Sequence, residues 1–80
     1  MELQFLRADG TPAAGALVGM AQAPVSMPDL AMVADAKGRV CIELPVSGHF
    51  VLSVWAGGRE HRLPCELAPG AGSRVLRLPD

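Results

Sequence analysis

The chain has 80 residues, of which 50% are hydrophobic, and a formal net charge of −1 at pH 7. A chain of this length predicts one domain, residues 1–80, that buries only somewhat more than about 60% of its unfolded surface. The near-neutral charge leaves no cluster of Lys and Arg for binding nucleic acid or an anionic membrane surface, and no apolar run is long enough to span a membrane.

Hydrophobic residues recur at every second position from the start of the chain. In residues 1–8, Leu3 and Phe5 alternate with polar side chains, and residues 15–20 continue as a second strand of small and apolar residues. Residues 21–32 contain two prolines, which cannot donate to a sheet, so we expect a loop over one end of the domain.

The same alternation continues through the second half of the chain. It predicts further strands over residues 38–45, 48–55, 59–67 and 73–78. In the strand 48–55 it assigns Phe50, Leu52 and Val54 to the core, and it therefore turns Val51 and Trp55 outward. No segment shows apolar residues at three-and-four spacing over the ten or more residues that a helix needs.

The turn residues agree with an all-β fold. Asp35 and Gly38 suit a tight hairpin built on a type I turn, and Gly57 with Gly58 suits a two-residue primed turn. Short strands at even spacing, separated by such turns, predict a β-sandwich of about seven strands.

Three segments resemble the carboxypeptidase regulatory-like domains, a group with a transthyretin-like (prealbumin-like) Greek-key sandwich. These are DGTPAAGALV (9–18), ADAKGRVCIELP (34–45) and SGHFVLSVWAGG (47–58). The matched positions are Asp9, Gly10, Pro12, Gly15, Ala16, Asp35, Gly38, Leu44, Pro45, Gly48, Phe50, Leu52 and Val54. Since each is a turn former or a core position, the resemblance implies the fold and a non-catalytic module engaged in protein contacts.

Metal binding and a disulfide are both disfavoured by strand geometry. His61 and Cys65 share a face, but four residues along a strand separate them by well over about 10 Å, too far to hold one ion. Cys41 alternates away from its apolar neighbours whereas Cys65 shares a face with them, so the two thiols are expected to be free. We expect no metal and no cofactor.

Catalysis is also disfavoured. Some transthyretin-like proteins hydrolyse 5-hydroxyisourate with histidines and an arginine and end in Tyr-Arg-Gly-Ser, whereas this chain has no tyrosine and ends RVLRLPD. An intramolecular isopeptide bond needs a lysine on the first strand, but the only lysine is Lys37, in a predicted turn. We therefore expect no catalytic residues.

An outward Trp55 suggests a protein interface. Val51, Trp55 and Leu17 are expected to form an apolar patch on the outer face of the sheet, where residues that contact only solvent are normally polar. Trp is also enriched at binding hot spots. The loop adds Met27, Leu30 and Met32, flexible apolar side chains of the kind found on adaptable surfaces. The alternative is that Trp55 folds over an open edge of the core.

These observations favour a non-enzymatic protein-interaction module, a small accessory or adaptor protein that docks on a protein partner or on itself. The start of the chain lacks a signal-peptide pattern, which favours a cytoplasmic location. Modules of this appearance also occur attached to bacterial secretion-spike proteins, so export with such a component is a second expectation. The alternative functions are a structural domain of a larger bacterial protein and, less favoured, a hydrolase of the 5-hydroxyisourate type.

Overall fold

The computed structural model describes residues 1–25, 31–70 and 72–79. Within these ranges there is no helix, and so none that is long and apolar enough to cross a membrane. The strands are β1 (Glu2–Leu6), β2 (Leu17–Gln22), β3 (Ala31–Val33), β4 (Arg39–Cys41), β5 (Gly48–Ala56), β6 (Arg59–Leu67) and β7 (Ser73–Arg77). The predicted all-β class is confirmed.

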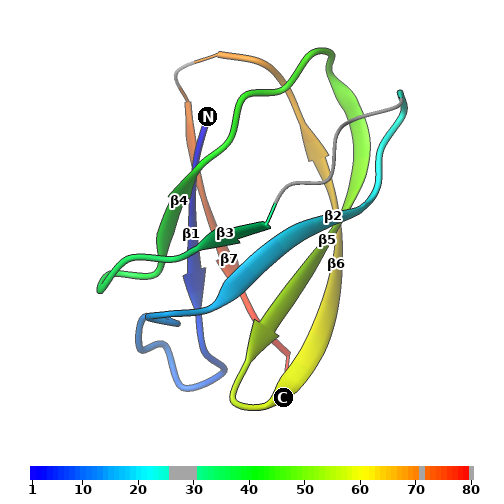
Figure 1. Ribbon diagram of the computed structural model, residues 1–80. Helices are drawn as coiled ribbons and strands as arrows, with labels where there is room; N and C mark the ends of the chain where they lie inside the picture. Colours follow the sequence, from blue (N-terminus) through cyan, green and yellow to red (C-terminus); the bar gives the residue numbers. More distant parts are fainter. Residues whose placement is uncertain (26–30, 71, 80) are drawn as a thin grey trace.

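The strands form two sheets that pack face to face as a small sandwich (Figure 1). One sheet has the order β4-β1-β7, in which β1 lies antiparallel to β4 and parallel to β7. The other has the order β3-β2-β5-β6, with all neighbours antiparallel. The chain changes sheet between β1 and β2, β3 and β4, β4 and β5, and β6 and β7.

The core lies between the inner faces of the two sheets. Its largest fully buried side chains are Leu3, Phe5, Val18, Phe50, Leu52 and Val54. Fully burying one such side chain contributes about 1.5–3 kcal/mol to the free energy of unfolding. The alternation of the sequence therefore decides which face of each strand turns inward, as predicted for β1 and β5.

Local side-chain chemistry closes two of the predicted turns, but only the second is a hairpin. The strands on either side of the first, β3 and β4, belong to different sheets, so the hairpin predicted at Asp35 and Gly38 is wrong although the turn is present. The Asp35 carboxylate accepts hydrogen bonds from the backbone N–H groups of Lys37 and Arg39, at 2.8 and 2.9 Å. Gly57 and Gly58 both have positive φ, 61° and 78°, and join Ala56 of β5 to Arg59 of β6. That pair of dihedrals is typical of the type I′ turn, whose twist matches that of the flanking strands.

The structure corrects the expectation of a loop over residues 21–32. β2 extends to Gln22, and a third strand begins at Ala31, pairing Leu17 with Val33. The prolines fall between these two strands rather than inside either of them, so they do not interrupt the ladder. Strands therefore take up both ends of the segment predicted to be a loop, and the sheet gains an edge strand.

The strand predicted over residues 38–45 is also shorter, ending at Cys41. Its partner β1 starts at Glu2, and the last bonds of this ladder are the mutual ones between the backbones of Met1 and Ile42, each 2.9 Å long. The ladder ends at this pair although the apolar alternation continues to Leu44.

Gly38 offers a test of how closely the turn between β3 and β4 approaches β1. Its φ is 75°, and a Cβ built on it would overlap the carbonyl oxygen of Phe5 and lie 3.0 Å from the backbone N of Ala13. We predict that Gly38→Ala lowers the free energy of unfolding by about 3 kcal/mol or more, since it combines left-handed strain with a backbone clash.

The matched control is Gly58→Ala. Gly58 has a similar φ of 78°, but a Cβ there meets no atom within 4 Å. Its cost should be strain alone, about 1–2 kcal/mol. Urea denaturation of both variants measures the difference, and equal costs would contradict the close approach.

Candidate functional site

The outer face of the four-stranded sheet carries a row of exposed apolar side chains. Val33 of β3, Leu17 of β2 and Trp55 of β5 are cross-strand neighbours, because Leu17 pairs with both of the others. Their exposed fractions are 68%, 42% and 49%. We refer to Val33, Leu17 and Trp55 as the apolar row.

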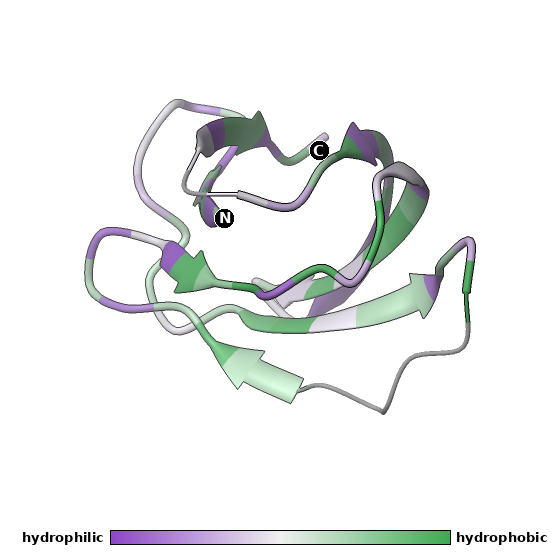
Figure 2. Ribbon diagram, turned by 90° about the horizontal axis from the view of Figure 1, so that it is seen from above, coloured by the Kyte–Doolittle hydropathy of each residue, from purple (hydrophilic) through white to green (hydrophobic). Residues whose placement is uncertain are grey.

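The next row along the same face consists of small side chains. Gly19 of β2 pairs with Ala31 of β3 and with Ser53 of β5. Figure 2 shows hydrophobic or neutral colours over the whole of β3 and most of β2. Small residues beside the apolar row leave this part of the sheet flat, so another backbone or side chain can approach closely.

Charged side chains lie on the β6 side of the row. Trp55 pairs with Glu60, whose carboxylate accepts a hydrogen bond of 2.7 Å from the Ser53 hydroxyl. The Arg62 Nε lies 3.7 Å from the other Glu60 oxygen. These polar groups satisfy one another within the sheet, so they form a rim that can be partly covered without leaving a lone charge.

The outer face of the other sheet has a different character. Arg39 Nη1 lies 3.9 Å from Glu2 Oε1, and the Gln4 side-chain amide donates to the carbonyl of Lys37 at 2.9 Å. Val75 of β7, 60% exposed, is the large apolar side chain exposed on this face. Only the four-stranded sheet therefore presents neighbouring large apolar side chains on its outer face, among the residues that the structure describes.

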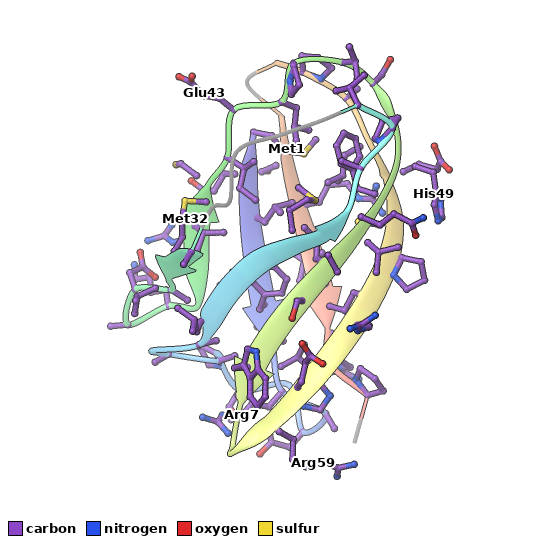
Figure 3. All side chains as sticks on the ribbon, turned by 45° about the vertical axis from the view of Figure 1, so that its right-hand side comes forward. Met1, Arg7, Met32, Glu43, His49 and Arg59 are labelled. Atoms are coloured by element: carbon purple, nitrogen blue, oxygen red, sulfur yellow. The ribbon has the colours of Figure 1, made fainter. Side chains whose placement is uncertain are left out.

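The predicted interface residues do not all come together. Leu17 and Trp55 are neighbours, and Val51 lies half-buried further along the same face of β5, opposite Pro64. Met32 pairs with the buried Val18 and packs against the core, so it lies on the inner face (Figure 3). Met27 and Leu30 lie outside the described residues.

Val33 completes the row but was not among the predicted interface residues. The alternation of Ala31 and Val33 with Met32 and Ala34 is the signal for β3, and it spans only a few residues after a proline-containing segment. Trp55 itself lies outside the core cluster, so it does not cover an open edge of the core.

The thiols lie where the alternation predicts, with Cys41 exposed and Cys65 buried. Burial raises the pKa of the Cys65 thiol, although the nearby Arg74 guanidinium opposes this effect. Arg74 of β7 donates a hydrogen bond to the carbonyl of Glu66 on β6, and so links the two sheets along their open side. In the described ranges, no three His, Cys, Asp or Glu side chains gather as metal ligands.

Comparison of the chain with protein-family models, with curated proteins and with solved structures finds no match. The resemblance to carboxypeptidase regulatory-like domains therefore stays a prediction.

The two cysteines provide a test of the strand faces. We predict that Cys41 reacts rapidly with a thiol reagent in the native protein and that Cys65 reacts only when the fold opens, because a buried thiol with a raised pKa forms little accessible thiolate. A time course with Ellman's reagent should be biphasic, and Cys41→Ser should remove the fast phase. Equal rates for both thiols, or loss of two hydrogens from the intact mass without reductant, would contradict the assignment.

Proposed function

We propose that this protein is a non-enzymatic protein-interaction module whose apolar row packs against the same row of a second copy. The observation that carries the proposal is the adjacency of Val33, Leu17 and Trp55 on one outer face. Neighbouring exposed apolar side chains are typical of interfaces, and Trp is the most enriched residue at their centres.

The order of residues in the row suits a two-fold contact. Leu17 is central, with Val33 on one side and Trp55 on the other. A two-fold axis that lies between the two faces, perpendicular to the row and midway between the two copies of Leu17, places Val33 of each copy against Trp55 of the other, so that the large side chain meets the small one. Such isologous pairing is the commonest arrangement of soluble homo-oligomers.

The area required favours use of the whole outer face. A standard interface buries about 800 Å² of each partner, and the accessible surface of this chain is 4667 Å². An interface of this size would therefore take about one-sixth of the surface of each copy, an area that one outer face of a two-layer domain can supply. The flat neighbouring row of Ala31, Gly19 and Ser53 would then be covered as well, with Glu60 and Arg62 at the rim.

The polar outer face of the three-stranded sheet supports a closed assembly. An association that uses one face on each copy ends at the dimer, whereas apolar patches on both faces would continue into a filament. A second copy also adds buried apolar surface to a domain whose small size limits its own core.

We predict that Trp55→Ser weakens self-association by about 2 kcal/mol or more, about thirtyfold in the dissociation constant. The unfolding free energy of the dilute monomer should change by less than about 1 kcal/mol, because the site is on the surface. Sedimentation velocity over a dilution series measures the association. Emission of the single tryptophan should move to longer wavelength on dilution.

The matched control is Val75→Ser, which removes an exposed apolar side chain from the opposite face. It should leave the dissociation constant within about twofold of the wild-type value, as expected for a residue outside the interface. Equal weakening by the two variants would contradict the assigned face. A wild-type chain that stays monomeric at millimolar concentration would show that the occupant of this face is not a second copy.

A further inference from the structure

The first half of β6 breaks the apolar pattern of the inner face. Register with β5 places Arg59 opposite Ala56 and His61 opposite the fully buried Val54, on the same face as Leu63, Cys65 and Leu67. Inner-face positions of a sandwich are normally apolar. A guanidinium and an imidazole at two successive inner-face positions therefore break this pattern, and packing of the core does not explain them.

These two side chains line a cavity of about 280 Å³ at the end of the sandwich. Its opposite wall comes from the other sheet, where Arg7, Ala8 and Asp9 follow β1 and Leu78 with Pro79 follows β7. Arg7 and Arg59 lie at the same end of the molecule, away from Glu43 and His49 (Figure 3). A Cβ on Gly57 would lie 3.7 Å from Arg7 Nη1, so this guanidinium reaches the β5–β6 turn.

The charge of the cavity is positive. Among the described residues, neither Arg7 nor Arg59 forms an ion pair within 4.0 Å. Asp9 is the carboxylate in the lining, and it accepts hydrogen bonds from Thr11 N at 3.0 Å and Thr11 Oγ1 at 2.7 Å. Those bonds, with a smaller contribution from Arg7, lower the pKa of Asp9. The carboxylate is thus engaged by Thr11, and Arg7 and the exposed Arg59 both line the cavity.

From this geometry we infer that the end cavity is a binding site for a small organic anion. Guanidinium groups match the geometry of carboxylate and phosphate oxygens, and Arg7 and Arg59 approach such a group from the two sheets. Ala56, Leu78 and Pro79 supply an apolar wall for a compact hydrocarbon portion. The volume lies at the small end of the range of ligand pockets, so the ligand is a small molecule rather than a chain segment.

The site is separate from the apolar row. Arg59 and His61 lie on the inner face of β6, whereas Glu60 and Arg62 alternate to the outer face beside the row. Anion binding and self-association can therefore be tested independently of each other. The alternative role of inward-pointing charges on an edge strand is protection against edge-to-edge association, which requires no ligand.

The test is a titration of the ¹⁵N-labelled chain with sodium benzoate and, separately, with sodium phosphate, each against sodium chloride at equal ionic strength. Saturable shifts are expected at Ala8, Gly57 and His61 for at least one of the two anions. Benzoate alone indicates a carboxylate with an apolar portion, and phosphate alone indicates a phosphate group. Arg59→Gln and Arg7→Gln should each weaken the binding by at least about tenfold, as loss of a charged hydrogen-bond donor does.

The matched control is Arg62→Gln, on the same strand but on the outer face, which should bind within about twofold of the wild-type affinity because its side chain does not line the cavity. Using variants from both walls keeps the test valid if one of them folds poorly. Shifts that increase linearly like those with chloride, or equal weakening by Arg62→Gln, would overturn the site and leave edge protection as the role of the inward charges.

Discussion

The burial of Phe50, Leu52 and Val54 on one face of β5 is the constraint on which the rest of the structure depends. All three are 0% exposed, and each contributes about 1.5–3 kcal/mol by burial. A shift of the strand by one residue would expose all three and bury Ser53, so the register is strongly determined. Because successive side chains alternate, this burial also turns Trp55 onto the outer face, beside Leu17.

Because β6 pairs with β5 along its whole length, the register of β5 also determines which residues of β6 face inward. At one end the inner face of β6 continues the core with Leu67 and Cys65, and Arg74 of the other sheet donates a hydrogen bond to the Glu66 carbonyl between them. At the other end the inward positions hold Arg59 and His61, and the space between the sheets remains open as a charged cavity. The inner face of β6 thus carries apolar side chains at one end of the ladder and cationic or titratable ones at the other.

Features that depend on neighbouring residues could be predicted from the sequence, and features that depend on distant pairing could not. The faces of β5, the turn before β4 and the β5–β6 hairpin follow from alternation and from residues such as Asp35 and Gly58. That the Asp35 turn leads from one sheet to the other does not follow from them. β3 escaped prediction because it has only three residues. The row that joins Val33, Leu17 and Trp55 depends on which strands share a sheet. The approach of Arg7 to the β5–β6 turn depends on how the two sheets stack, which no local pattern specifies.

The pleat of β5 separates a core face from an outer face, and we propose that a second copy covers the outer face. Paramagnetic relaxation by a soluble gadolinium chelate, measured on side-chain protons in dilute and in concentrated samples, tests both parts together. In dilute solution, relaxation should be strong at Leu17, Val33 and Trp55 and weak at Leu52. In concentrated solution the row should become protected while Val75 remains accessible. Protection of Trp55 in the dilute monomer would contradict its place on the outer face, and an apolar row that stays accessible at high concentration would contradict its burial by a second copy.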